Sequence, residues 1–562
     1  MAIIGIDLGT TNSLAACRRN GKTELIRNSI GDAFTPSAVS IDDDEDVLVG
    51  RIAVERLISH PGRSASEFKR YIGQRREIAL GGKSFTPEEL SSLVLKKIKS
   101  DAEKHLGEPV DEAVISVPAY FDDNARSATK LAAELAGLKA ERLVNEPSAA
   151  ALAYLAAHDF RAGTYLIVDF GGGTLDVSVV DAFDSIIEIL AVAGDNHLGG
   201  KDFNEAIAHY FCTVNEIDYN ALSPDSRAVI YKTAESCKRT LSELPMTIMA
   251  ANIDGKQYSM TLDNNKLIEI SSDIFGRISA PIKKVLRDSR CSMSEIDDII
   301  LVGGSCKMPT VQAFIEKITG KSPCTDINPE TAVAVGAGIF AGIKSRNEEL
   351  KDVILTDICP FSLGTSTLDE TSGELVMSFI IERNTALPAS REQTFSAIRD
   401  GQSKVKIDIY QGESILPKKN LFLGELEVDC PPAKKHTPIC RVRMTYDVNG
   451  ILMVDVITTG DGKTSTKLFS GNRGTLSGEE ADKCRRHMES LRILPAEKEQ
   501  NRFLIARAER AFEEAPSIER EMIQHHLNLF RAALKLGSGH EIRRTYSALS
   551  TLLDRFDNMG EL

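Results

Sequence analysis

Asp7-Leu8-Gly9-Thr10-Thr11-Asn12 and Asp169-Phe170-Gly171-Gly172-Gly173-Thr174-Leu175-Asp176 share one pattern. Each follows a short apolar run, at 3–6 and 165–168, that predicts a strand ending near an aspartate. Glycine lets the backbone approach a phosphate, amide and threonine hydroxyl groups donate to its oxygens, and a carboxylate can hold a hydrated metal. A single turn of this kind is typical of a hairpin. Two of them, with further glycine pairs at Gly199-Gly200 and Gly303-Gly304, predict loops that bind one triphosphate from both sides.

The length and charge of the chain restrict its class. It has 562 residues, of which 42% are hydrophobic, and this length predicts several domains. A net charge of -14 argues against a nucleic-acid partner. The ten cysteines include no Cys-x-x-Cys pair, so they give no support to a zinc or thioredoxin-like motif and fit a reducing compartment. No apolar run approaches the roughly 18 residues of a membrane span, so we expect a cytoplasmic protein without a membrane partner.

The pattern of the chain changes twice. Up to residue 351, expected strands at 113–117, 143–145, 166–169 and 299–302 alternate with expected helices at 124–136, 147–156, 308–318 and 331–343, which indicates an α/β region. From 359 to about 470, period-two alternation and an Asn449-Gly450 turn predict a β domain. After Ser477, which can form a capping box with Glu480, the pattern is helical. One helical stripe is formed by Ile542, Tyr546, Leu549, Leu553 and Phe556.

The segment 352–357 joins the α/β and β regions. It is apolar and bracketed by acids, whereas an ordinary linker is polar. We therefore expect it to dock on another part of the chain or to form an edge strand of either neighbour.

Taken in order, these motifs resemble the DnaK-type members of the seventy-kilodalton heat-shock chaperone family over nearly the whole chain. The matching segments are 5–13, 117–121, 145–151, 169–176, 194–200, 300–305 and the linker. The resemblance implies an actin-like α/β nucleotide-binding domain at 1–351, a linker at 352–358, a β-sandwich peptide-binding domain at 359–471 and a short α-helical lid at 472–562. The short stretch after Gly73 and the linker sequence are most similar to the HscC branch.

The resemblance implies hydrolysis of ATP to ADP and phosphate, with Mg²⁺ and, as a further candidate ion, K⁺. The catalytic roles fall on Asp7, Lys69, Glu146, Asp169 and Thr174, of which Asp7, Asp169 and Glu146 would hold Mg²⁺ mostly through water. Phosphate contacts fall on Gly9, Thr10, Thr11, Asn12, Gly171, Gly172, Gly173, Asp176, Gly199 and Gly200. Without the resemblance, Lys69 would be an ordinary surface lysine. The chain has no Walker loop, and Gly336-Ala337-Gly338 lies inside a helical pattern, so neither a P-loop nor a Rossmann domain is indicated.

Nucleoside contacts are also carried over from the family. The spacing i, i+3, i+4, i+7 puts Glu235, Lys238, Arg239 and Ser242 on one helix face, which without the resemblance would be an exposed charged face. The opposite wall is formed by Gly303, Gly304, Ser305 and Lys307. Lys307 replaces an arginine that stacks on the base, and Lys201 stands where an acid is usual. We expect weaker stacking and looser contacts across the cleft.

In the β domain the resemblance implies a peptide channel lined by Leu368, Phe395, Val405 and Ile407, residues that pattern alone would place in an ordinary core. Thr365 and Ile398 depart from the family, which predicts a channel that is more polar at one point and narrower at another. Pro118 and Arg126 match the relay between nucleotide and linker. Contacts with a J-domain partner fall on Arg142, Asn145, Leu355 and Asp357. The need for a nucleotide-exchange factor stays open.

The sequence therefore predicts an ATP-dependent chaperone that binds and releases extended hydrophobic segments of client proteins. One alternative is an actin-like structural ATPase or sugar kinase, which would have no peptide-binding β domain. Another is a nucleotide-exchange or holding factor with weak turnover. Lys69, Glu146 and Thr174 count against that alternative, whereas Lys201 and Lys307 leave it open.

Overall fold

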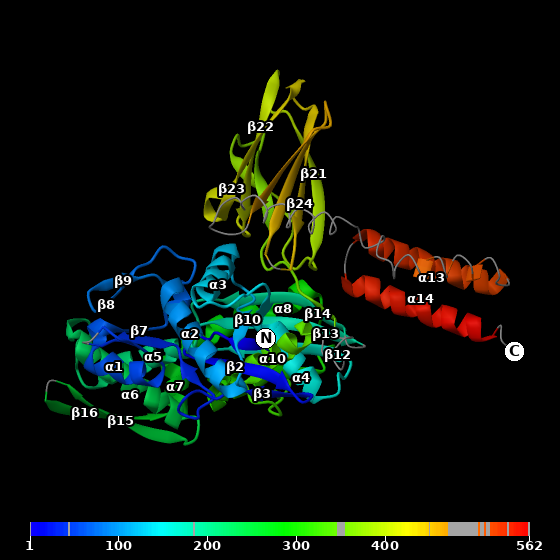
Figure 1. Cartoon of the computed structure of the whole chain (residues 1–562). Helices are drawn as coiled ribbons and strands as arrows, with labels where there is room; N and C mark the ends of the chain where they lie inside the picture. Colours follow the sequence, from blue (N-terminus) through cyan, green and yellow to red (C-terminus); the bar gives the residue numbers. More distant parts are fainter. Residues whose placement is uncertain are drawn as a thin grey trace. The chain divides into compact units, whose positions relative to one another are not determined.

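The computed structural model describes residues 2–42, 45–183, 186–253, 255–345, 354–448, 450–469, 504–505, 508, 511–512, 517–536 and 539–559. The chain divides into two compact units, Met1–Leu355 and Thr356–Leu562 (Figure 1). The capping box predicted at Ser477 and Glu480 lies outside the described residues. No helix within the described ranges is both long and apolar enough to cross a bilayer.

The first lobe of unit 1, residues 2–145, is built on a sheet of strand order β11-β10-β1-β2-β3, in which β4 also pairs with β2. Strands β1 and β10 are parallel, which places Asp7 beside Ser116 at the carboxyl ends of these two inner strands. The strands of this sheet are β1 (Ala2–Asp7), β2 (Asn12–Arg19), β3 (Lys22–Leu25), β4 (Thr35–Pro36), β10 (Val110–Val117) and β11 (Leu143–Asn145). The other elements are β5 (Ala38–Ile41), β6 (Val47–Val49), α1 (Arg51–Ser59), β7 (Ser64–Ser66), the short helix η2 (Phe68–Tyr71), β8 (Ile78–Leu80), β9 (Lys83–Phe85), α2 (Pro87–Leu106) and α3 (Asp123–Leu135).

The second lobe, residues 163–319, repeats this arrangement with the order β17-β12-β13-β14, to which β18 adds an edge strand. As β1 does in the first lobe, β12 pairs in parallel on one side and antiparallel on the other. These strands are β12 (Gly163–Phe170), β13 (Leu175–Phe183), β14 (Ile186–Asp195), β17 (Asp298–Val302) and β18 (Ile354–Thr356). The other elements are α5 (Gly200–Val214), α6 (Pro224–Thr240), the hairpin β15 (Met246–Ile253) and β16 (Lys256–Asp263), α7 (Asn264–Ile270), α8 (Ser272–Ser289), the short helix η4 (Gly304–Lys307) and α9 (Pro309–Thr319). Residues 354–356 of the apolar linker form β18, an edge strand of the preceding sheet.

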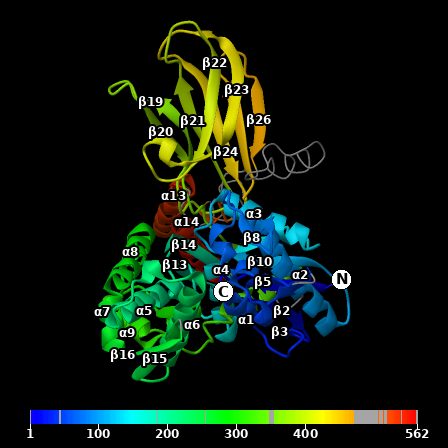
Figure 2. The same ribbon diagram turned by 90° about the vertical axis from the view of Figure 1, so that its left-hand side faces the viewer.

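Helices α4 (Glu146–Ala157) and α10 (Ala332–Lys344) join the two lobes. Helix α10 packs on β1 and on α4, and α4 packs on β12, β13 and β14. The two helices touch at backbone level, because a Cβ on Gly336 would lie 1.8 Å from the carbonyl oxygen of Ala149. Figure 2 shows the lobes side by side, with β13, β14 and α5 in one and β2, β3 and α2 in the other.

The second unit contains two four-stranded antiparallel sheets, β20-β19-β22-β23 and β21-β24-β25-β26, that share one hydrophobic core. The strands are β19 (Leu363–Leu368), β20 (Leu375–Ile381), β21 (Ala389–Ser396), β22 (Gln402–Gln411), β23 (Leu421–Ala433), β24 (Pro438–Tyr446), β25 (Leu452–Thr458) and β26 (Thr464–Phe469). The predicted hairpin is confirmed by the pairing of Tyr446 with Leu452, although Asn449 itself lies outside the described residues.

Two antiparallel helices follow in the sequence, α13 (Ser517–Leu536) and α14 (Gly539–Met559). Phe530 of α13 and Leu549 and Leu553 of α14 are fully buried between them, with Ile542 and Tyr546 packed at the margin. The side chain of Phe556 lies outside the described residues. The apolar stripe predicted for this helix is therefore its packing face.

Candidate functional site

The two aspartate-glycine loops face each other in unit 1. Asp7 ends β1 and Asp169 is the penultimate residue of β12. A Cβ on Gly172 would lie 2.1 Å from Thr11 Oγ1, and one on Gly173 would lie 3.0 Å from Thr10 Cγ2. The Thr11 hydroxyl oxygen is buried without a hydrogen-bond partner. The two loops thus form opposite walls of one site, with an unused donor between them.

Lys69 is buried at this site. Its Nζ lies 2.9 Å from Glu146 Oε1 and 5.6 Å from the centre of the Phe121 ring. The Lys69 side chain is only 4% exposed, because η2 turns it inward from the first lobe. The surface position expected from pattern alone is therefore wrong, and the structure pairs Lys69 with Glu146. The catalytic roles of the two residues stay a prediction.

Buried carboxylates surround this ion pair. Burial, followed by repulsion from Glu146, raises the pKa of Asp7 to about 7 and that of Asp176 to about 8. The same two causes raise the pKa of Asp169 well above its usual range. Lys69 lowers each of these pKa values without offsetting the other causes. The site therefore holds more negative charge than the chain itself neutralises, which fits a divalent cation.

The structure also supplies hydrogen bonds to these carboxylates. Ser116 Oγ donates to Asp7 Oδ1 at 3.0 Å, and the amide of Tyr120 donates to Asp176 Oδ1 at 3.3 Å, whereas Asp176 Oδ2 is buried without a partner. Among the described residues, Asp7, Asp169 and Glu146 do not bring one oxygen each within 4.8 Å of one another.

A cavity of about 80 Å³ opens beside Lys69 and Thr174. Its wall contains Thr10, Phe121, Asn196 and His197, so both lobes contribute to it. Sequence reasoning gave no role to Phe121, Asn196 or His197, although they lie in the segments 117–121 and 194–200 that carried the resemblance. Asn196 donates from Nδ2 to the carbonyl oxygen of Tyr120 at 3.1 Å, which ties the two segments together.

The second loop is held from two sides. The amides of Gly200 and Lys201, at the start of α5, donate to the carbonyl oxygens of Gly171 and Gly172 at 3.0 Å. A Cβ on Gly199 would lie 2.3 Å from the backbone nitrogen of Gly173, so only glycine allows this approach. From η4, Ser305 Oγ donates to the same Gly171 oxygen at 2.7 Å. Gly199 and Gly200, predicted as phosphate contacts, thus position the loop. Gly303 and Gly304, predicted for the nucleoside wall, are the N-cap and the first residue of η4.

The predicted nucleoside residues are only partly on one helix face. Glu235, Lys238 and Arg239 lie on α6, but α6 ends at Thr240. Ser242 lies in the following turn, where its amide donates to the carbonyl oxygen of Arg239 at 3.0 Å, so its predicted helical position is wrong. Lys238 donates from Nζ to the carbonyl oxygen of Gly200 at 2.7 Å, and burial lowers the pKa of Lys238 to about 8. Arg239 is exposed, and Lys307 forms an ion pair with Glu330.

Lys201 links the two lobes. Its Nζ lies 2.5 Å from Glu67 Oε1, so a first-lobe acid is paired with a second-lobe base. At this point Glu67 supplies a charge complementary to Lys201. The looser contact across the cleft expected from the loss of an acid at position 201 stays a prediction.

The residues predicted for the nucleotide–linker relay and for J-domain contact have different neighbours. Arg126 donates from Nη2 to Asn145 Oδ1 at 2.5 Å and from Nε to the carbonyl oxygen of Phe121 at 3.2 Å, in the segment that Pro118 begins. The Arg142 guanidinium lies 5.3 Å from the centre of the Phe340 ring. Leu355 is part of β18, whereas Asp357 belongs to the second unit, where its carbonyl oxygen accepts from the Leu387 amide at 2.7 Å.

The predicted channel residues divide into two groups. Val405 and Ile407 are buried in the shared core of the two sheets, and Thr365 is buried with its hydroxyl lacking a partner. Leu368 and Ile398 are exposed, and Phe395 is half-buried. The channel itself stays a prediction.

Comparison with known proteins identifies relatives across nearly the whole chain. The family model described as "Hsp70 protein" matches residues 3–555. The chaperone protein DnaK of Prochlorococcus marinus is 38% identical, over 90% of this chain and 84% of the relative. Heat shock 70 kDa protein 7 of Arabidopsis thaliana, a chloroplast protein, is 36% identical over 98% of this chain and 81% of its own length. The stromal 70 kDa heat shock-related protein of Pisum sativum is 36% identical, with 98% and 83% covered.

Proposed function

This chain belongs to the Hsp70 family and is an ATP-dependent chaperone that hydrolyses ATP, and we propose that hydrolysis takes place at the site around Lys69 and Glu146. The observation that carries this proposal is the buried ion pair, 2.9 Å long, beside a cavity that Thr10 and Thr174 line from opposite lobes. A buried lysine is held there at the cost of its hydration, which is typical of a functional site.

The two loops bind the phosphates. Thr10, Thr11 and Asn12 on one side, and Gly171, Gly172, Gly173 and Thr174 on the other, offer amide and hydroxyl donors. The unpartnered Thr11 hydroxyl supports this role, since a buried donor without an acceptor is costly unless a ligand supplies one. Asn12 and Gly9 position the first loop, and Gly199 and Gly200 position the second.

Hsp70 ATPases use ATP and Mg²⁺, and bound Mg²⁺ neutralises negative charge on the phosphate oxygens. Asp7, Asp169 and Glu146 would hold it, mostly through water. The raised pKa values of Asp7 and Asp169 support this assignment, since a cation relieves the repulsion that raises them. A K⁺ site is a further proposal, to which the described residues add no particular ligand set.

Lys69 places its charge at the γ-phosphate and orients the attacking water. Glu146 fixes the Lys69 ammonium, and Phe121 excludes solvent from one side of it. Thr174 and Asp176 lie on the attacking side, where the unpartnered Asp176 Oδ2 can accept a hydrogen bond from water. Positioning of this kind accounts for most of the catalysis in phosphoryl transfer.

The nucleoside lies between α6 and η4. Glu235, Lys238, Arg239 and Ser242 form one wall, and Gly303, Gly304, Ser305 and Lys307 form the other. Lys307 is held by Glu330 and lacks a planar guanidinium, so it stacks on the base more weakly than arginine.

The second unit binds clients, as a β-sandwich with a short helical lid. Leu368, Phe395 and Ile398 are accessible to an extended peptide, whereas Thr365, Val405 and Ile407 support the sheet beneath. A J-domain partner contacts Arg142, Asn145, Leu355 and Asp357, and Pro118 and Arg126 relay the nucleotide state. The four-part division at 351, 358 and 471, the HscC branch and a cytoplasmic location remain predictions; two of the relatives named above are chloroplast proteins.

Single-turnover hydrolysis by wild type and by Lys69→Ala tests the proposal. We expect hydrolysis to fall at least about 100-fold in the variant, as when one charge-stabilising donor is removed, while nucleotide still binds. Lys83→Ala is the control, because Lys83 forms an exposed ion pair with Glu45 in the same lobe. Equal hydrolysis in wild type and Lys69→Ala would refute the assignment, and negligible hydrolysis by wild type would favour a holding factor with weak turnover.

A further inference from the structure

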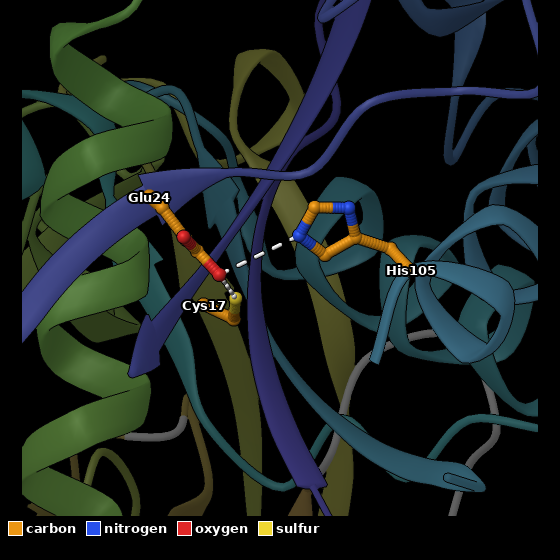
Figure 3. Close-up of side chains that lie close together, drawn as sticks. All are labelled: Cys17, Glu24 and His105. Carbon is orange, nitrogen blue, oxygen red and sulfur yellow. Dashed lines mark hydrogen bonds and ion pairs between the residues drawn. The ribbon is translucent and has the colours of Figure 1, made fainter. Parts of the chain in front are cut away.

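A second cluster of metal-binding side chains lies away from the nucleotide loops, in the first lobe. It consists of Cys17, Glu24 and His105 (Figure 3). Glu24 Oε1 lies 3.7 Å from Cys17 Sγ and 3.5 Å from His105 Nε2. One ligand atom of each residue lies within 4.8 Å of the other two, and no other trio of His, Cys, Asp or Glu in the described part of the chain has this property.

The fold explains why the three residues meet. Cys17 on β2 and Glu24 on β3 are directly opposite in the antiparallel pairing, so their side chains are neighbours on one face. His105 lies in the last turn of α2, which packs on β2. Gly107, with φ of 74°, ends the helix just beyond it. Three elements therefore converge on one point, each with one ligand atom.

We propose that Cys17, Glu24 and His105 bind a divalent transition-metal ion of the zinc class, with the fourth position open to solvent. Thiolate, imidazole and carboxylate are the ligands that Zn²⁺ takes in proteins. At metal–ligand distances of about 2.0 to 2.3 Å, tetrahedral ligand atoms lie roughly 3.3 to 3.8 Å apart. Two of the three separations already fall in this range, and the half-buried His105 side chain can close the third by a small rotation.

The charges of the cluster suit a dication. Without an ion, the Cys17 thiol donates to Glu24 Oε1 at 3.7 Å. On binding, the sulfur–hydrogen bond breaks, the proton leaves to solvent, and a sulfur–metal bond forms. The resulting thiolate and the Glu24 carboxylate together balance two positive charges, with His105 neutral. The sulfur ligand selects against Mg²⁺, which prefers oxygen.

A bound ion would fasten the C-terminal end of α2 to the β2–β3 hairpin. β3 is the edge strand of the first-lobe sheet, where it pairs with β2 and packs on α10. The site would therefore stabilise the lobe that carries Lys69 without touching the nucleotide loops.

Cobalt titration of the chelator-treated full chain tests the proposal. We expect one equivalent of Co²⁺ to produce a thiolate-to-cobalt absorption band that Zn²⁺ removes. The band should be absent in Cys17→Ser. Glu24→Gln and His105→Gln, at half-exposed positions, should lower the Co²⁺ affinity at least tenfold. The matched controls are Cys291→Ser and His209→Gln, which change a cysteine and a histidine outside the cluster.

The sulfur band separates this site from the nucleotide site, whose expected ligands are oxygens. Because Cys17 is buried, circular dichroism must show that Cys17→Ser is folded, and Glu24→Gln keeps the test decisive if it is not. Wild type without the band, or an unchanged affinity in both Glu24→Gln and His105→Gln, would overturn the proposal.

Discussion

Lys69 and Glu146 come from different parts of unit 1, yet they form a buried ion pair of 2.9 Å. If the two side chains act together in catalysis, the effects of the two substitutions on the activation free energy of hydrolysis are not additive. We expect Lys69→Met and Glu146→Gln each to slow single-turnover hydrolysis by at least about 100-fold. The double variant should be little slower than the worse single variant. Effects that multiply would show that the two residues act independently.

The ion pair between Glu67 and Lys201 connects the two lobes across the nucleotide site. We expect Glu67→Lys and Lys201→Glu each to speed the release of a fluorescent ADP about fivefold, since partly exposed pairs contribute about 1 kcal/mol. The exchanged variant, Glu67→Lys with Lys201→Glu, should restore the wild-type rate. Stopped-flow measurement of all four proteins checks this, and faster release in the exchanged variant would contradict a role for the pair.

Lys238 predicts a pH dependence of stability. Burial lowers its pKa to about 8 in the folded chain, from an ordinary value of 10.5. Between these values the unfolded chain binds more protons than the folded chain, so this group makes the free energy of unfolding rise with pH. Between about pH 7.5 and 9.5, the free energy of unfolding of nucleotide-free wild type should rise by about 2 kcal/mol relative to that of Lys238→Met. Urea unfolding followed by circular dichroism checks the gain.

The matched control for that experiment is Lys232→Met, which changes an exposed lysine of the same helix. A difference between wild type and Lys238→Met that stays constant with pH would mean that the Lys238 ammonium is hydrated in the folded chain.

Thr365 is buried in β19, and its hydroxyl has no hydrogen-bond partner. Thr365→Val removes the unsatisfied oxygen and keeps the shape, so we expect the second unit to become more stable by about 1 kcal/mol. Slower hydrogen exchange of the β19 and β22 amides would report this. Thr367→Val, at a half-exposed position on the same strand, should have a smaller effect. Faster exchange in Thr365→Val would indicate that the hydroxyl makes a stabilising bond.

Local patterns predicted much of the fold. β11 begins and ends at the predicted residues, and the predicted helices at 124–136 and 147–156 differ from α3 and α4 by at most one residue at each end. The hairpin at 449–450 and the stripe of α14 were also predictable, because period and turn chemistry are local properties. Ser242 was wrongly placed on the helix. Pro245 was a local signal that the helix ends near here, because proline disfavours helix in the residue before it.

Long-range partners could not be predicted in this way. The burial of Lys69 depends on Glu146, which is 77 positions away, and the cross-lobe pair depends on Glu67, which no sequence pattern connects to Lys201. The cluster of Cys17, Glu24 and His105 joins a hairpin to a helix end without any spaced metal motif. These contacts arise from packing, so single-chain patterns carry no signal for them.

We propose that ATP hydrolysis at the Lys69 site is coupled to client binding in the second unit. The most direct measurement is single-turnover ATP hydrolysis with and without a panel of extended hydrophobic peptides, for wild type and Lys69→Ala. We predict that at least one peptide speeds hydrolysis by wild type and that the variant shows neither hydrolysis nor stimulation. Wild-type hydrolysis that no peptide changes, or peptide stimulation that persists in Lys69→Ala, would contradict the account.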